Sequence, residues 1–288
     1  MKKIFALLMI CALVLMTGCG GSQGDNDNKS ADKKDNKIKL GMITRLNASE
    51  DNFGKFMEQL EETLDIKIGS HTIVFFDSLS QMQSALQAGK IDEISTYHSV
   101  ARYMLAKNPQ FQVLKDHSLE FIDSFCFALR DDEKELTETL NKVIGDMQAD
   151  GTLAKLSKEY ITDINAEHDP PVVELPKLDG ADTIKVAVTG DLPPLDFVSA
   201  DGKPAGFNTA VLAEISKRIN KNIELVQVDS GARAAALTSK QADVVFWAII
   251  PVSEIIPSDS DKPEGVTLTV PYFKDKIVHM IFKAEEKK

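Results

Sequence analysis

Apolar stretches of strand length alternate with stretches of helical periodicity along most of the chain. In the first half, this pattern predicts strands at 38–44, 71–76 and 91–96, and a helix at 80–89 that ends at Gly89. A further helix is predicted after Asn47, which can form a capping box with Glu50. Its apolar face would be Phe53, Phe56, Met57, Leu60 and Leu64.

Two consecutive helices are predicted next, at 133–149 and 151–160. Prolines at 170, 171 and 176 then favour an extended connector within 163–182. The alternation resumes with helices predicted at 206–219 and 230–242, and with strands at 183–190, 222–228, 243–250 and 271–283. Such alternation is typical of parallel sheets with helices packed on them, so the predicted fold class is α/β. About 250 residues suffice for two compact lobes.

The N-terminus has the features of an export signal. Two lysines precede an apolar run of 13 residues, which is too short to span a bilayer core that needs about 20. The ending Thr17-Gly18-Cys19 resembles a bacterial lipobox, which implies cleavage after residue 18 and a lipid on the Cys19 thiol. An ordinary secretory signal is the alternative. We therefore expect an extracytoplasmic protein of the cell envelope, anchored to the membrane through Cys19.

Residues 19–37 are polar and are predicted to be a disordered tether. The chain has 33 basic and 44 acidic residues, a formal charge of −11, and loss of 1–18 would leave 31 basic residues and a charge of −13. This balance, with no basic cluster, argues against a nucleic-acid partner. Cys126 would be the only cysteine besides Cys19 after cleavage, so no intramolecular disulfide is expected.

Little in the sequence indicates catalysis. The five histidines show no metal-ligand spacing, and no phosphate-binding glycine loop or nucleophile elbow is present. We therefore predict no metal, no cofactor and no enzymatic activity. An acid/base pair such as Glu254 and His98 leaves an enzyme as an alternative.

Five stretches carry a resemblance to a known family. "VAVTGDLPPLDFVSADGKPAGFNTAVLAEISKRI", "LTSKQADVVF" and "TVPYF" look like the first lobe of the extracellular solute-binding proteins of family 3, the polar amino-acid receptors of ABC importers. "TIVFFDSLSQMQSALQAGKIDEISTYHSVARYMLAKNP" resembles that family's second lobe. "FALRDDEKELTETLNKVIGDMQADGTLAKLSKEYI" resembles its returning strand and C-terminal helices.

The resemblance implies a two-lobed, periplasmic-binding-protein-like fold of type II, in which each lobe is a mostly parallel sheet flanked by helices. The order of the segments implies a circular permutation: 38–118 would be the family's second lobe, 119–165 its last strand and helices, 166–182 a proline-rich connector, and 183–288 its first lobe. Two tandem truncated receptors are the alternative. A permutation is tolerated when the original termini lie close together.

In such folds a ligand binds between the lobes, beyond the carboxyl ends of the strands. The resemblance implies an arginine, an acidic residue and an aromatic around an amino acid, but these positions fall near Ile255, on Tyr97 and on Leu192. Arg45 is the best replacement for the arginine, because it lies in a loop at a helix N-terminus and could grip a carboxylate with two hydrogen bonds. The ligand-binding candidates are Asp191, Arg45, Trp247, Arg233, Tyr97, His98 and Leu192.

Most of these candidates also have a structural interpretation. Both arginines could be solvated or paired on the surface, Asp191 could cap a turn, Trp247 could pack in the core, and Tyr97 and His98 could be ordinary loop residues.

The predicted function is a monomeric receptor that captures a small polar solute, an amino acid or a related compound, for an ABC permease. The alternative is a degenerate or sensory domain that recognises a peptide, a wall fragment or a protein partner.

Overall fold

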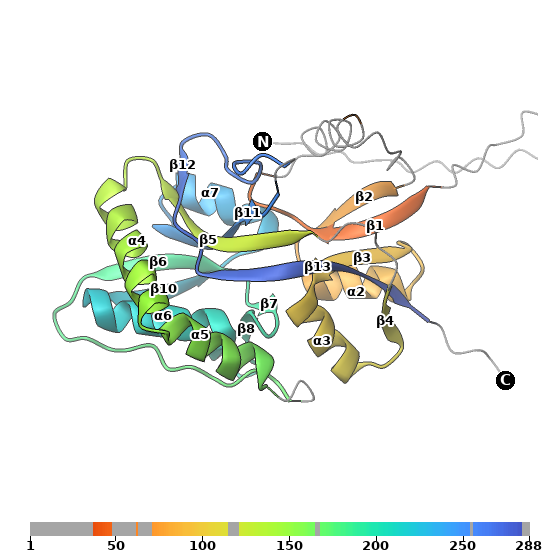
Figure 1. Ribbon diagram of the computed structural model, residues 1–288, viewed down its shortest axis with the longest axis horizontal. Helices are drawn as coiled ribbons and strands as arrows, with labels where there is room; N and C mark the ends of the chain where they lie inside the picture. The colour runs from red at the N-terminus through yellow and green to blue at the C-terminus, as the bar shows by residue number, and fades with distance from the viewer. Residues whose placement is uncertain are drawn as a thin grey trace, which may run out of the picture. The chain divides into compact units, whose positions relative to one another are not determined.

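Two sheets meet along a pair of long strands, β5 (Ile122–Arg130) and β13 (Phe273–Phe282), which lie side by side through the middle of the fold (Figure 1). Residues 273–276 of β13 pair with β5, and residues 277–280 pair with β3 (Glu93–Tyr97), so β13 belongs to both sheets. The computed structural model describes residues 37–47, 62, 71–114, 121–164, 168–253 and 256–283. The chain from Lys37 onward forms one compact unit.

The N-terminal lobe is the sheet β13-β3-β1-β2 with helices α2 and α3 among its described elements, and within it β1, β2 and β3 are parallel. Its helix α2 begins after Ser78, whose hydroxyl accepts a hydrogen bond from the Gln81 amide, and it buries an apolar face that includes Met82 and Leu86. The elements of this lobe, besides β3 and half of β13, are β1 (Ile38–Ile43), β2 (His71–Phe76), α2 (Leu79–Gln87), α3 (His98–Lys107) and β4 (Phe111–Val113).

The C-terminal lobe is the sheet β10-β6-β11-β5, with β12 also beside β5, and a small sheet β7-β8-β9. Strands β10, β6 and β11 are parallel, whereas β5 runs antiparallel to β11. A π-helical turn (Lys158–Thr162) extends α5, and a 3-10 turn (Ser230–Ala232) leads into α7. The other elements are α4 (Lys134–Ala149), α5 (Thr152–Ser157), β6 (Thr183–Val188), β7 (Asp191–Leu192), β8 (Asp196–Val198), β9 (Pro204–Ala205), α6 (Gly206–Ile219), β10 (Asn222–Gln227), α7 (Arg233–Thr238), β11 (Val244–Pro251) and β12 (Val266–Leu268).

Helices cover both faces of the C-terminal sheet, because successive side chains of a strand point to opposite faces. In β5, Phe125, Phe127 and Leu129 pack into the larger core together with residues of α4, α5 and α6. Cys126 and Ala128 point the other way, into a smaller core with α7. Every residue of β5 from 123 to 130 is buried, which explains the continuous apolar run at 125–129.

The structure confirms most of the predicted elements to within a few residues, including α2, α4, α6, β1, β2 and β11. The hydrophobic pattern did not predict α3 or the short strands β4, β7, β8, β9 and β12. Within the predicted connector, the described residues form one isolated bridge, between Val172 and Ala205. The predicted helix after Asn47, the signal, the tether and Cys19 lie outside the described residues. None of the helices that the structure describes is both long and apolar enough to cross a bilayer.

Candidate functional site

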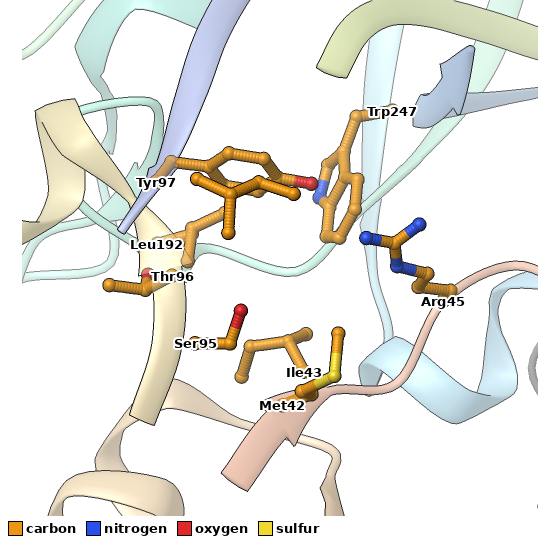
Figure 2. A pocket seen from close by; sticks show the side chains of 9 residues that line it. Met42, Ile43, Arg45, Ser95, Thr96, Tyr97, Leu192 and Trp247 are labelled. Carbon is orange, nitrogen blue, oxygen red and sulfur yellow. The ribbon is translucent and has the colours of Figure 1, made fainter. Parts of the chain in front are cut away.

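A small cavity lies between the two lobes, where β1, β3, β7, β11 and β13 come together (Figure 2). Its volume is about 30 Å³, which is room for about two water molecules. A larger solute could therefore enter only if the lobes separated or the lining side chains moved. The lining residues are Met42, Ile43, Arg45, Ser95, Thr96, Tyr97, Leu192, Trp247 and Ile277.

Of the described residues that line this cavity, Arg45 alone is charged, and it is already paired. Its Nη2 lies 3.3 Å from Oδ2 of Asp123, and the Tyr97 hydroxyl donates to the same oxygen at 3.2 Å. The Asp123 side chain is 3% exposed and that of Arg45 is 22% exposed. Burial alone would lower the pKa of Arg45, but the charge of Asp123, with smaller contributions from its neighbours, raises it overall. The Arg45 guanidinium therefore stays charged at any physiological pH.

Asp261 fixes the loop that carries Arg45. One carboxylate oxygen accepts from the Asn47 amide at 3.0 Å, and the other accepts from the Ile249 amide in β11 at 3.0 Å. Burial raises the pKa of Asp261, and the positive charges of Arg45 and Arg233 oppose that rise. The carboxylate thus connects the two lobes and holds the Arg45 loop against β11.

Trp247 reaches the cavity because β11 is irregular at this position. The register between β11 and β5 shifts between Val245 and Ala248, and such a bulge re-aims the side chains within it. The indole is 2% exposed, and its Nε1 has no hydrogen-bond partner among the residues that the structure describes. In Figure 2 the indole lies between the Tyr97 ring and the Arg45 guanidinium, with its nitrogen on the Tyr97 side.

Arg233 lies behind Trp247, away from the lining of the cavity. Its guanidinium carbon is 3.8 Å from the centre of the Trp247 ring, a close cation–π contact. Its Nε donates to the Ser230 carbonyl at 3.0 Å, its Nη1 donates to the Trp247 carbonyl, and its Nη2 donates to the Thr44 carbonyl of the other lobe at 2.7 Å. The structure therefore places this arginine as a bridge between the lobes.

Two further aspartates join the lobes at helix N-termini, where free amides attract anions. Asp191 accepts from the Leu79 amide, the first of α2, at 2.8 Å. Asp77 accepts from the Gly231 amide at 3.0 Å, and a Cβ at position 231 would lie only 2.6 Å from its Oδ1. These two contacts bring the lobes close together.

The pKa of Asp191 is raised to about 6, mainly by burial and further by the charges of Asp196 and Asp229, although hydrogen bonds from the α2 amides oppose the rise. A carboxyl group whose pKa is higher in the folded than in the unfolded state binds its proton more tightly when the protein is folded. Its contribution to stability is therefore complete below the unfolded pKa of about 3.9, and it is lost as the pH rises through the folded pKa. Ionised Asp191 should therefore reduce stability at neutral pH.

We predict that Asp191→Asn is more stable than the wild type by about 1 to 3 kcal/mol at pH 7.5 and equally stable at about pH 3, below the unfolded pKa. The amide oxygen can still accept from Leu79, while the cost of burying the charge disappears. Urea unfolding of both proteins at the two pH values measures the difference, and the titration of other carboxylates cancels in it. A less stable Asn variant at pH 7.5 would show that attraction to the α2 amides outweighs burial.

Four of the seven sequence-predicted ligand residues line the cavity: Arg45, Tyr97, Leu192 and Trp247. Asp191 and Arg233 lie outside its lining and bridge the lobes instead. His98 is exposed at the start of α3. Glu254 and Ile255 lie outside the described residues.

The sequence analysis did not single out Asp123, Ser95, Thr96 or Asp261. Asp123 offered a signal, since it is the only acidic residue in the apolar stretch 121–129. Asp261 offered none, because it follows other polar residues in a loop. Within the described part of the chain, no three histidine, cysteine or carboxylate side chains gather closely enough to hold a metal ion.

Residues 184–285, which supply β6 to β13, match the sequence model of the bacterial extracellular solute-binding proteins, family 3. Over these residues the chain is similar to that family. Leu192, Trp247 and Ile277 of the cavity fall inside the matched segment, whereas the Arg45–Asp123 pair comes from the part that precedes it.

Curated relatives of this family include the histidine-binding periplasmic proteins of Salmonella typhimurium and Escherichia coli K12, each 33% identical over 95 residues. The match covers 31% of this chain and 36% of each relative, so the chain spans about a third of their length.

Solved structures similar to this chain include a nutrient-binding protein from Burkholderia cenocepacia bound to methionine. It is 10% identical, with a TM-score of 0.39 and coverage of 85% of this chain and 84% of that one. A ligand-binding component of an ABC-type import system from Staphylococcus aureus, with zinc bound, is 12% identical. Its TM-score is 0.40, and the match covers 85% of this chain and 65% of that one.

Proposed function

We propose that this protein is an extracytoplasmic receptor that captures a small solute, an amino acid or a related compound, between its two lobes. The observation that carries this proposal is the cavity between the lobes, where one charged side chain, Arg45, faces a largely apolar and aromatic wall. A charged group beside an apolar wall is the usual composition of a small-molecule site. The family match and the histidine-binding relatives support a solute of amino-acid type.

The receptor would work by opening and closing. The cavity holds about 30 Å³ when the lobes are joined as described, so a solute must enter an open form and be enclosed when the lobes return. We further propose that the closed form delivers the solute to an ABC permease, and that a lipid on Cys19 keeps the receptor at the membrane. The lipobox-like ending at Cys19 supports the anchor.

The order of the lobes in the chain is, in our proposal, a circular permutation of the family's order. The family match begins at residue 184, although β1 to β5 precede it. Strand β5, before the connector, pairs with β11, after it. This pairing supports a permutation, since two tandem truncated receptors would keep their strands in separate sheets.

The experiment that tests solute binding is thermal unfolding of the full chain against a panel of amino acids, short peptides, carboxylates and amines. A compound at about a hundred times its dissociation constant adds about 2.7 kcal/mol of stability, which raises the melting temperature by roughly 5 to 10 °C. We expect a shift that Arg45→Met abolishes and that the surface variant Arg218→Met retains. If no compound shifts the wild type, the receptor proposal fails.

A second candidate function is a sensory or scaffold domain, and the direct bonds between the lobes favour it. Arg45–Asp123, Arg233–Thr44 and Asp191–Leu79 join the lobes directly. Small-angle scattering separates the two functions. A receptor should populate a more extended open form that contracts with an active compound, whereas a scaffold should keep one radius of gyration throughout.

A further inference from the structure

We propose that residues 169–173, within the proline-rich connector, are a strap that fastens the two lobes to each other outside the cavity. The first residue of the strap is bound to helix α3 of the N-terminal lobe, and its last residues are bound to β9 and α6 of the C-terminal lobe. This inference goes beyond solute capture, because it concerns how the lobes are joined and applies equally to a receptor and to a scaffold.

Asp169 attaches the strap to the N-terminal lobe. Its Oδ1 accepts a hydrogen bond from the Tyr103 hydroxyl at 2.8 Å and lies 2.9 Å from Nζ of Lys107. Tyr103 and Lys107 are one turn apart on α3, and the Lys107 ammonium lies 5.3 Å from the centre of the Tyr103 ring. The hydrogen bonds from Lys107 and Tyr103 lower the pKa of Asp169, so its carboxylate is charged at neutral pH. Two donors on one face of α3 therefore converge on one oxygen of the strap.

Pro171 and Val173 attach the other end of the strap to the C-terminal lobe. The Pro171 carbonyl accepts from the amide of Gly206, the first residue of α6, at 3.2 Å. The Val173 amide donates to the Pro204 carbonyl of β9 at 2.9 Å. Val173 is also buried in the larger core. The strap therefore moves with the C-terminal lobe.

The piece of chain between the two attachments is short and stiff. Pro170 alone separates Asp169 from Pro171 in the sequence, and the ring of each proline fixes its φ near −65°. A rotation of α3 against the C-terminal lobe must therefore break or distort the bonds of Asp169, because the strap has no slack. A flexible segment of the same length would let the lobes move while those bonds stayed intact.

The strap is strong enough to bias the positions of the lobes and too weak to fix them permanently. The side chains of Lys107 and Asp169 are 36% and 59% exposed, and an exposed ion pair contributes little by itself. Alternative arrangements of one protein usually differ by small free energies, so a weak contact still changes their populations severalfold. Arg102 of α3 adds two long hydrogen bonds to the same junction, to the carbonyls of Ile161 and Thr162 at 3.3 and 3.4 Å.

Amide hydrogen exchange of the full chain, followed by NMR, tests the strap through two amides that lie outside it. The Leu79 amide donates to Asp191 and the Gly231 amide donates to Asp77, in both cases from one lobe to the other. Each amide is released when the lobes separate, so its exchange rate reports the population of the separated form. These two reporter amides have no bond to any residue of the strap.

Three variants weaken the strap in different ways. Tyr103→Phe removes one hydroxyl and Asp169→Ala removes the acceptor, and each should speed exchange at both reporter amides about fivefold, the effect of one ordinary hydrogen bond. Pro171→Gly removes no donor and tests the stiffness, and it should speed exchange about two- to fivefold. The matched control is Asp146→Ala. Asp146 also pairs with a lysine, Lys142 at 2.7 Å, but both belong to α4, so the reporters should not change.

The Phe127 amide, which donates to Thr269 inside the C-terminal lobe, is the internal reference and should exchange at the same rate in every variant. Unchanged exchange at Leu79 and Gly231 in the three strap variants would overturn the strap, since these residues would then only cover the C-terminal lobe. An equal increase at Phe127 would overturn it too, because the lobe itself would be unfolding. No solute is needed for these measurements, so their result is independent of the proposed function.

Discussion

Replacing Arg233 with methionine should lower the free energy of unfolding by about 3 to 5 kcal/mol, a large part of the 5 to 15 kcal/mol of a typical domain. The arginine is 1% exposed and donates to the carbonyls of Ser230, Trp247 and Thr44. Methionine fills a similar volume against the Trp247 ring but cannot donate to any of the three oxygens. Buried acceptors without partners are the main source of the expected loss.

Arg233→Lys should not restore the lost stability, because the single ammonium group of lysine cannot donate in the planar arrangement of a guanidinium. The matched control is Arg102→Met. Arg102 also donates to two carbonyls, those of Ile161 and Thr162, but at 3.3 and 3.4 Å in a more exposed place. We expect this control to cost less than about 1 kcal/mol. Urea unfolding measures all three variants, and an equal cost for Arg233→Met and Arg102→Met would contradict the bridging role.

Arg233 also shows why its role was hard to predict. The sequence indicated a helix start near the cleft, and the structure places it there, at the first residue of α7. Its environment, however, is set by Thr44, which is 189 residues away in the chain. No local pattern specifies that the carbonyls of three separate segments converge on this guanidinium.

The elements of the fold were accessible to sequence reasoning because hydrophobic periodicity is a local property. The helix predicted at 206–219 is α6 with the same bounds, and the predicted strand at 71–76 is β2. The site was less accessible. The register shift in β11 that brings Trp247 to the cavity depends on pairing with β5, and the sequence of β11 alone reads as a regular buried strand.

The Arg45–Asp123 pair should show strong energetic coupling in a double-mutant cycle. Arg45→Met leaves Asp123 buried with the Tyr97 hydroxyl as its remaining side-chain partner among the described residues, and should cost about 2 to 4 kcal/mol of unfolding free energy. Asp123→Asn should cost about 1 to 3 kcal/mol, because the guanidinium is partly exposed to water. In the double variant neither charge is left without a partner. We therefore expect its loss of unfolding free energy to be smaller than the sum of the two single losses by about 1 to 3 kcal/mol.

Urea unfolding of the four proteins gives this coupling energy, and the surface pair Arg218–Asp150 provides the matched cycle. Its atoms are closer, 2.7 Å apart, but the side chains are 28% and 46% exposed, so its coupling should stay below about 1 kcal/mol. Additivity at Arg45 and Asp123 would mean that water already screens the two charges. Strong coupling would mean that the pair is shielded from water and holds the loop after β1, in one lobe, to β5 in the other.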